Sequence, residues 1–538
     1  MNKGFKMTWM AYLAVLTTAQ AGPLLSPADA ALAAAKDIGT VATDSRSSCR
    51  YLTVYNFPPV ERGEAVKILS VHLNGLSREP ELVIPAVVPG TEGSLLRIDI
   101  RDYGWDPKTW DKLGEFDTYF HVQLQRRQQA VIKRTTDENG HKWFRVGDGD
   151  WVLEYQNVNG QLVQKNKLPE PEKGEEVRAL APWLSRSEID AKQLGYLAEA
   201  TQSVSPILRA DWFLRHTAVQ EADKFGGKAP GYYDFLKIAN QKDYEEALGL
   251  NLKLVRTAFK DETAAAVARS TVALNNRRLL RFGKIGGGAW FTLDAKENVG
   301  KQNYLRVLDT DRKAKTFLEL IAQKDEYTAT ESFGPLPNGL MIWGLFNNEG
   351  EKQTNAPDFI ASDGKAPGTD KRVHVNMSCI RCHVDGIQPI KDWVRRLVSN
   401  PLELKTPDYD AFKRARQLYT SDLEGKIKGD QLIYATAVSS ASGGMTTEKF
   451  ARAYALFWAR YQETDFDVDR IALETGYTKE MVLKGLDGLV KKVGGIDPVV
   501  AGLLRAMANN HGGEIPIRSE QWEEVFPVFM TYMRGAVP

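Results

Sequence analysis

Two residue types that commonly bind metals are scarce in this sequence, because its 538 residues include only three cysteines and seven histidines. No second C-x-x-C and no H-x-x-x-H pair occurs, so the four-ligand zinc site of a structural metal domain is not expected. Excess charge is also lacking. The net charge is +1, and nothing points to nucleic acid or to an acidic membrane surface as a partner. Beyond the first residues, no stretch is apolar enough to predict a transmembrane helix.

Two of the three cysteines belong to one motif, Cys379-Ile380-Arg381-Cys382-His383, which reads C-x-x-C-H. This is the pattern for covalent attachment of a c-type haem. Two thiols separated by two residues can each form a thioether with one vinyl group, and the imidazole that follows then ligates the iron. The sequence therefore predicts one covalent haem c, with Cys379 and Cys382 as attachment residues and His383 as the proximal iron ligand.

Two other interpretations of the motif stay open. A zinc half-site would need two more ligands, and Cys49 and His374 stand at unsuitable spacings for that role. A redox dithiol or disulfide would be expected between a strand and a helix, whereas this motif follows a long polar loop. Cys49 itself is expected to be a small buried side chain, although in an oxidising compartment it could react or pair between chains.

The ligand on the far side of the iron decides what the haem can do. A methionine or histidine there saturates the iron and gives an electron carrier, whereas an open site allows peroxide or small-gas chemistry. Met445 is the preferred distal candidate, because it lies in a Gly-Gly loop just before a capped helix. His374, Met377 and His511 are the alternatives, and an open site is a further one.

The N-terminus has the features of a secretory leader. Lys3 and Lys6 precede an apolar run at residues 7–18, and Ala19-Gln20-Ala21 is a small-x-small cleavage site. The run is short for a bilayer span, so cleavage is expected and an uncleaved anchor is the alternative. Because bacterial c-type haem is attached outside the cytoplasmic membrane, the leader and the motif both predict a periplasmic or otherwise exported protein.

The length allows about three domains of ~150 residues, and the expected fold class is α+β, predominantly helical, with small β elements and a haem-bearing region before a helical C-terminal part. The expected segments are a signal peptide (1–21), a linker or weak helix (22–48), an N-terminal α+β domain (49–183) with a β-rich insertion (about 122–168), a central mainly helical domain with short strands (184–348), a haem-attachment segment (349–400) and a C-terminal helical domain (401–538).

Hydrophobic periodicity predicts the individual elements. Strands are expected at 51–57 and 95–100 and as a pair over 333–346. Helices are expected at 60–76, 244–259, 275–282, 390–398, 450–461, 465–475, 479–493, 499–509 and 519–532. The glycines at 286–288 lack the Lys-Ser/Thr of a phosphate-binding loop and are expected to form a tight turn.

The sequence also resembles a family of large secreted bacterial single-haem c-type cytochromes, abundant in planctomycetes and also found in proteobacteria. The resemblance extends over roughly 49–386 and implies a secreted single-haem redox protein. Leu280-Arg281-Phe282 stands where members often carry an Arg-His pair, so no histidine is carried over there. The runs that carry the resemblance, besides the haem motif, are Arg50–Asn56, Leu73–Arg78, Leu96–Trp105, Arg209–Phe213 and Leu336–Leu340.

These observations favour a periplasmic cytochrome that transfers single electrons to or from a redox partner protein. A haem enzyme with peroxidase-like or small-gas chemistry is one alternative, although periplasmic di-haem peroxidases carry two C-x-x-C-H motifs. A binding or scaffold module is the other, because a carrier alone needs only ~100 residues around its haem. No catalytic residue and no small-molecule substrate is assigned.

Overall fold

The computed structural model describes residues 26–117, 119–120, 123–126, 132–146, 150–167, 177–180, 188–220, 229–250, 262–269, 276–284, 286–295, 327–356, 362–363, 371–392, 395, 416–492, 498–509 and 517–533. The fold is α+β, with about 49% helix and 20% strand. The expected fold class is confirmed to that extent. The expected leader at 1–21 lies outside the described residues.

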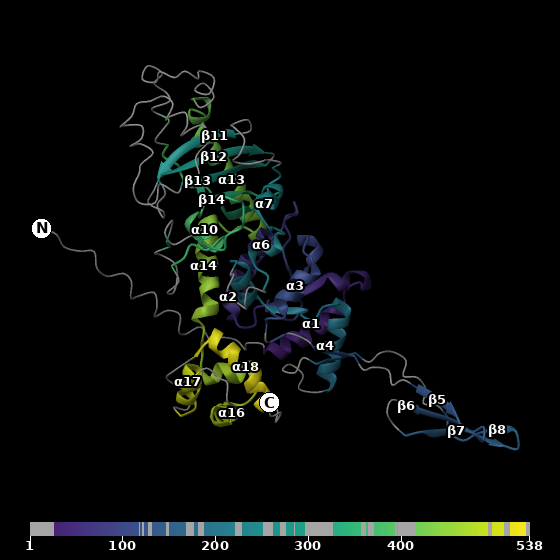
Figure 1. Cartoon of the computed structure of the whole chain (residues 1–538). Helices are drawn as coiled ribbons and strands as arrows, with labels where there is room; N and C mark the ends of the chain where they lie inside the picture. The colour runs from purple at the N-terminus through teal and green to yellow at the C-terminus, as the bar shows by residue number, and fades with distance from the viewer. Residues whose placement is uncertain are drawn as a thin grey trace.

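The helices extend over most of the chain (Figure 1). They are α1 (Pro27–Ile38), α2 (Pro59–Gly75), α3 (Pro107–Gly114), α4 (Glu188–Thr201), α5 (Ala210–Thr217), α6 (Tyr232–Phe235), α7 (Gln241–Ala247), α10 (Met377–Cys382), α13 (Leu423–Ser442), α14 (Thr447–Glu463), α15 (Val468–Thr475), α16 (Lys479–Lys492), α17 (Pro498–Asn509) and α18 (Ser519–Met533).

Within the described residues, the strands form five separate sheets. They are β1 (Cys49–Thr53), β2 (Ala86–Val87), β3 (Leu95–Asp99), β4 (Gln123–Arg126), β5 (Ile132–Thr136), β6 (Lys142–Val146), β7 (Val152–Val158), β8 (Gln161–Gln164), β9 (Val177–Leu180), β10 (Ile207–Arg209), β11 (Glu262–Arg269), β12 (Asn276–Lys284), β13 (Gly287–Ala295), β14 (Tyr327–Pro335), β15 (Met341–Asn347), β16 (Asp465–Phe466) and β17 (Ile517–Arg518).

A five-stranded antiparallel sheet in the order β11-β12-β13-β14-β15 lies at one end of the molecule (Figure 1). Gly286 and Gly287 take positive φ angles of 78° and 125° between β12 and β13, which glycine does without steric cost. The predicted tight turn is therefore confirmed. The helix predicted over 275–282 is wrong, because Asn276–Lys284 is strand β12, paired on both sides with Arg278 opposite Leu293 and Val267.

A second sheet, in the order β10-β1-β3-β2, joins distant parts of the chain. β1 pairs antiparallel with β3 and parallel with β10, so that Leu52 lies opposite both Leu96 and Leu208. All five residues of β1 are buried. The predicted strands at 51–57 and 95–100 are confirmed here, although β1 begins two residues earlier and ends at Thr53.

The strands β5 to β8 form an antiparallel meander that lies apart from the other labelled elements (Figure 1). Its turns use residues with positive φ, namely Gly140 (76°), Asn159 (51°) and Gly160 (84°). The β-rich character expected for the insertion is confirmed over these strands. The β8 residues are all exposed.

The segment predicted as a linker or weak helix at 22–48 contains a helix. Residues 27–38 form α1, which begins with a capping box at Ser26 and Asp29 and has Pro27 at its first position. Its alanine face is buried against α4, in a core that also contains side chains from α15 to α18. The first and last described helices thus share one hydrophobic core.

The C-terminal part is helical, as predicted. In α14 the residues Phe450, Tyr454, Phe457 and Tyr461 recur every three or four positions and are all buried. The helix contacts α2, α5, α10, α13 and α18, so its aromatic stripe belongs to the core. The predicted helices at 465–475, 479–493, 499–509 and 519–532 correspond to α15, α16, α17 and α18, with the short strand β16 before α15.

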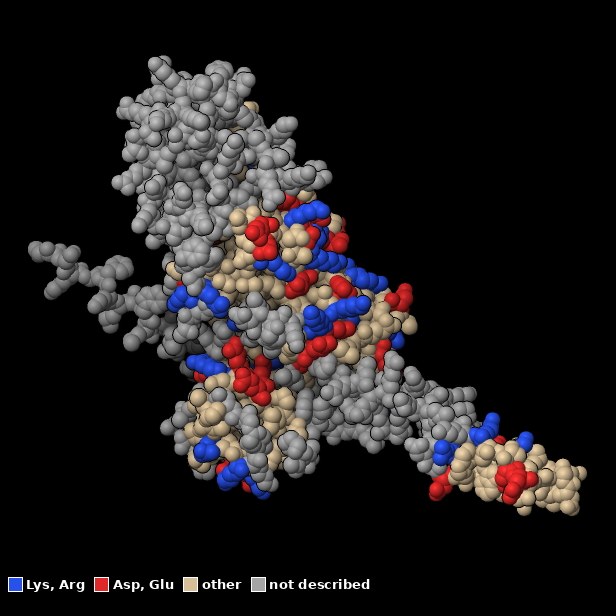
Figure 2. All heavy atoms as spheres, viewed as in Figure 1, with Lys and Arg blue, Asp and Glu red and all other residues tan. Residues whose placement is uncertain are grey.

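On the face drawn in Figure 2, basic and acidic residues are mixed over the described surface rather than gathered by sign. This arrangement agrees with the net charge of +1. None of the described helices has both the length and the apolar character that a helix needs to cross a bilayer.

Candidate functional site

The C-x-x-C-H motif occupies a single helical turn. α10 covers Met377–Cys382, and the His383 N–H continues it by donating to the Cys379 carbonyl oxygen at 2.7 Å. Residues three apart in a helix lie on the same face, so both thiols are presented on one side of α10. His383 follows at the C-cap position, directly after the second thiol.

The His383 imidazole is oriented by its own turn. Its Nδ1 lies 2.9 Å from the carbonyl oxygen of Gly386. Because a carbonyl only accepts, Nδ1 carries the proton and the Nε2 atom carries the lone pair. The ring also packs against two neighbouring aromatic side chains, with centroids 5.4 Å from Phe333 and 5.2 Å from Trp343. These contacts fix the plane of the imidazole.

Gly386 is required for this turn. Its φ is +80°, a conformation that other residues adopt only with strain. A Cβ atom there would stand 3.0 Å from Cε of Met341 and 3.3 Å from Cδ1 of Tyr434. The Gly386 N–H donates to the His383 carbonyl at 2.8 Å, so a compact glycine turn holds the acceptor that orients the imidazole.

The two motif thiols differ in their surroundings. Burial, and then the nearby carboxylate of Glu331, raises the pKa of the Cys379 thiol well above its ordinary value. Cys382 is half-buried. None of the three cysteines forms a disulfide. Cys49 is 4% exposed, and its Sγ lies 3.3 Å from the Ser45 carbonyl oxygen, as expected for a small buried side chain.

The motif turn reaches the surface of the protein. Arg381, Cys382, His383 and Val384 are half-buried, and Asp385 is exposed. Arg381 forms an ion pair with the buried carboxylate of Asp363.

The loop that carries Met445 lies beside the motif turn. Thr447 Oγ1 donates to Asp385 at 2.6 Å, which joins the residue two positions after Met445 to the residue two positions after His383. Met445 itself is 4% exposed and belongs to the main core. The structure therefore brings the two loops together.

The other distal candidates fall in different places. His374 is buried and donates its backbone N–H to Ser378 at 3.0 Å. Met377 is the first residue of α10, on the same turn as the cysteines. His511 lies outside the described residues.

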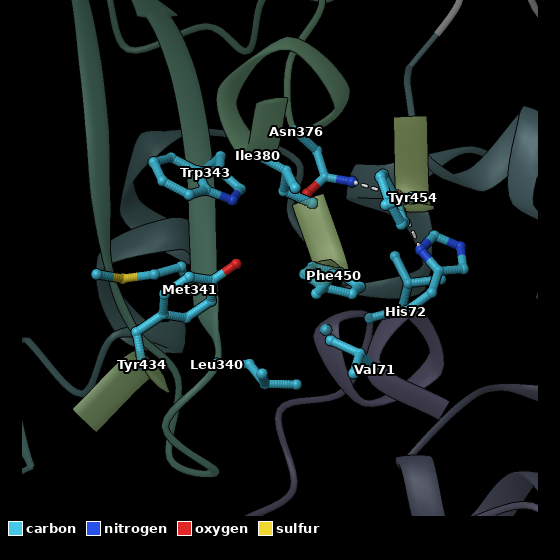
Figure 3. A pocket seen from close by; sticks show the side chains of 12 residues that line it. Val71, His72, Leu340, Met341, Trp343, Asn376, Ile380, Tyr434, Phe450 and Tyr454 are labelled. Atoms are coloured by element: carbon cyan, nitrogen blue, oxygen red, sulfur yellow. Dashed lines mark hydrogen bonds between the residues drawn. The ribbon is translucent and has the colours of Figure 1, made fainter. Parts of the chain in front are cut away.

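A small cavity lies on another face of α10. It is lined by residues of α2, α10, α13, α14 and the end of the β14–β15 hairpin (Figure 3). Its volume, measured as the space open to the centre of a water molecule, is about 20 Å³. From the α10 region, Asn376 and Ile380 line the cavity. Cys379 and Cys382 are not among the lining residues. The cavity is therefore distinct from the face that presents the thiols.

A buried hydrogen-bonded chain leads away from this cavity. His72 Nδ1 lies 3.0 Å from the Tyr454 hydroxyl, and His72 Nε2 lies 2.7 Å from Thr217 Oγ1. Because the Thr217 hydroxyl donates to the Phe213 carbonyl, it accepts from His72, so Nε2 carries the proton and the Tyr454 hydroxyl donates to Nδ1. Burial lowers the pKa of His72 to about 3, so the imidazole is neutral.

The same chain fixes the start of α10. The Asn376 amide donates to the Ala218 carbonyl at 3.0 Å and to the Tyr454 hydroxyl at 3.4 Å. Asn376 precedes α10 with φ +63° and ψ −64°, an uncommon backbone conformation for a residue other than glycine. Helices α2, α5 and α14 therefore hold the residue from which the motif turn begins.

The donor set fits a covalent haem. Two thiols lie on one helical face, and the imidazole beside them has Nδ1 bonded to a carbonyl, as is usual for ligating histidines. In the part of the chain that the structure describes, no group of three or more His, Cys, Asp or Glu residues converges as a metal cluster. The 20 Å³ cavity is far too small for a porphyrin.

The sequence alone identified the C-x-x-C-H motif but not the residues that orient His383 and hold α10 in place. Gly386 could have been noticed as a glycine three residues after the histidine. Phe333 and Trp343 lie in strands that were predicted, but no signal tied them to His383. His72 and Tyr454 come from helices that are remote in sequence, so only the folded chain shows that they meet.

Comparisons with known proteins add no relative. No protein-family model, no curated protein and no solved structure matches this chain.

Proposed function

We propose that this protein is an exported single-haem c-type cytochrome that exchanges single electrons with a redox partner protein. The observation that carries the proposal is the C-x-x-C-H motif on one helical turn, with the imidazole of His383 held by the carbonyl of Gly386 at 2.9 Å. Haem c, when bound, supplies an iron centre that alternates between ferrous and ferric states.

The residues around the motif have separate roles in this proposal. Cys379 and Cys382 would anchor the porphyrin through two thioethers. His383 would ligate the iron through Nε2, because its Nδ1 is engaged with Gly386. Phe333 and Trp343 restrict rotation of the imidazole, so the ligand is oriented before the iron binds.

Exposure of the motif turn favours electron exchange with a protein. Arg381 to Val384 are half-buried and Asp385 is exposed, so a partner could approach close to the attachment site. A catalyst that excludes water would need a more enclosed site. Met445 is retained as the proposed distal ligand, because its loop is hydrogen-bonded to the motif turn through Thr447 and Asp385.

The test is a haem stain after denaturing electrophoresis, together with oxidised and reduced spectra of the exported protein. We expect covalent haem in the wild type and none in the double variant Cys379→Ala Cys382→Ala. The matched control is Cys49→Ala, which should keep its stain because Cys49 lies in β1, outside the motif. A wild-type protein without stain would reject the proposal.

A further inference from the structure

Three buried side chains bring polar atoms to the lining of the cavity beside α10. Trp343 is 2% exposed, and its indole N–H is buried with no hydrogen-bond acceptor among the described residues. Tyr434 is 3% exposed and Asn376 is 5% exposed. The Tyr434 hydroxyl and the Asn376 amide oxygen are two further polar groups among the lining side chains.

The three atoms point into the same space. In Figure 3 the indole nitrogen of Trp343, the hydroxyl of Tyr434 and the amide oxygen of Asn376 are all directed toward the middle of the lining residues. The amide nitrogen of Asn376, at the other end of the group, donates hydrogen bonds to the Ala218 carbonyl and the Tyr454 hydroxyl. This engagement fixes which end of the amide faces the cavity.

The chemistry of the three atoms defines the occupant. The Trp343 N–H can only donate, the Asn376 oxygen can only accept, and the Tyr434 hydroxyl can do both. An occupant must therefore accept at least one hydrogen bond and donate at least one. It must also be neutral, since the lining residues include no ionised side chain to pair with a charge.

The volume of the cavity limits which molecule could occupy it. A cavity of about 20 Å³ by this measure exceeds the ~10–15 Å³ that one water molecule needs, and a buried water needs two to four polar partners. We propose that this cavity is a binding site for one buried water molecule, held by Trp343, Tyr434 and Asn376. The remaining walls are apolar, including Val71, Leu340 and Phe450, so a second water would lack partners.

The site has a definite place in the structure. Trp343 packs on His383 with centroids 5.2 Å apart, and Asn376 is the N-cap residue of α10. The water would therefore connect the aromatic neighbour of the imidazole, the start of the motif turn and α13. The inference rests on these side chains and the cavity, and it holds whether or not the protein carries haem.

The test is a high-resolution crystal structure of the full mature protein, with a second crystal pressurised with xenon. We expect one solvent peak within hydrogen-bonding distance of Trp343 Nε1, Tyr434 Oη and Asn376 Oδ1, and no xenon at that position. Xenon in the cavity would show a dry apolar void and would overturn the inference. Side chains that rearrange to pair with one another would also overturn it.

A variant gives an independent readout. Tyr434→Phe removes one of the three partners, so the solvent peak should weaken or disappear while the peaks at other buried waters persist. Leu432→Phe on the same helix is the matched control, because Leu432 is 68% exposed and the solvent peak should be unchanged. If Tyr434→Phe left the peak at full strength in the same position, the proposed coordination would be wrong. Should that variant fail to fold, the wild-type crystal alone decides.

Discussion

His72 and His383 illustrate two ways in which one residue type is used in this protein. His383 is half-buried at the surface turn, with Nδ1 bonded to a carbonyl and two neighbouring aromatic rings packed against it. His72 is 4% exposed and has both nitrogens bonded to hydroxyl groups. The arrangement of His383 suits an iron ligand. The arrangement of His72 satisfies the hydrogen bonds of a buried ring, in which a charge would be energetically costly.

His72 gives a prediction about acid stability. Its folded-state pKa of about 3 lies below the ordinary value of 6.5, so between these values the unfolded chain binds more protons than the folded protein. Stability should therefore fall as the pH drops below about 6.5, by up to ~1.4 kcal/mol per pH unit. Between pH 6.5 and 4.5, wild-type protein should lose about 2 kcal/mol more unfolding free energy than His72→Gln, measured by urea denaturation at each pH. If wild-type protein and His72→Gln lost equal amounts of unfolding free energy over this pH range, the prediction would be contradicted.

Met445 gives a prediction about the iron. If its thioether is the distal ligand, Met445→Leu should abolish the weak long-wavelength absorption of methionine-ligated ferric haem and make the iron accessible to added imidazole. The substitution nearly conserves volume, so its stability cost should stay below about 1.5 kcal/mol. Met481→Leu is the control, because Met481 is 46% exposed on α16. An unchanged spectrum in Met445→Leu would remove Met445 from the coordination sphere.

At the scale of the element, the turn after α10 depends on one glycine. Gly386→Ala would place a Cβ on a backbone with φ +80°, within 3.0 Å of Met341 Cε. We expect a loss of about 1–3 kcal/mol in unfolding free energy, together with weaker haem attachment because the acceptor of His383 would shift. Chemical denaturation and haem stain per mole of protein measure the two effects.

Gly63→Ala is the matched control for that substitution. Gly63 is exposed within α2, and a Cβ there would meet nothing within 4 Å. Alanine should stabilise the helix by about 0.5–1 kcal/mol without affecting the haem. A destabilisation at Gly63 as large as that at Gly386 would show that the turn geometry is not the cause.

Some secondary-structure elements could be predicted from the sequence and others could not. The aromatic positions of α14 repeat at helical spacing and face the core, so that helix is predicted well. β12 reads Asn-Arg-Arg-Leu-Leu-Arg-Phe, and its apolar residues fit a short helix as well as a strand. It becomes a strand because β11 and β13 pair with it on both sides, and such pairing is a long-range effect that local pattern does not contain.

At the scale of the whole molecule, the last helix is attached to the N-terminal part by buried charge. Glu523 of α18 pairs with Arg209 and accepts a hydrogen bond from the Tyr461 hydroxyl. Arg209 also pairs with Asp117 at 3.4 Å. Nearby, the rings of Tyr119 and Phe526 stack with centroids 4.1 Å apart. No sequence pattern tied residue 523 to residue 209, because the connection exists only after folding.

Glu523 gives the prediction that belongs to this scale. Removing one partner of a buried ion pair costs about 3–5 kcal/mol, and Asp117 still compensates Arg209 in part, so Glu523→Ala should lose about 3 kcal/mol of unfolding free energy. Glu524→Ala is the matched control, since Glu524 is the next residue on the same helix and is exposed, and it should change stability by less than about 0.5 kcal/mol. Equal effects would show that the buried pair does not hold α18.

The site shows the same division between motif and surroundings. The three residues of the C-x-x-C-H motif that bind haem are local in sequence, so spacing alone singles them out. Trp343 and Tyr434 reach the α10 region from β15 and α13, and Asn376 is held from α5 and α14. The roles of these three residues depend on how elements far apart in the sequence pack together. Hydrophobic periodicity along the sequence does not contain that information.

The account depends on a covalent haem, and the mass of the mature exported protein tests this most directly. Intact-protein mass spectrometry should show the polypeptide plus one haem, with only the Cys49 thiol left to alkylate after denaturation. A mass equal to that of the bare polypeptide, with Cys379 and Cys382 both alkylated, would contradict the central claim.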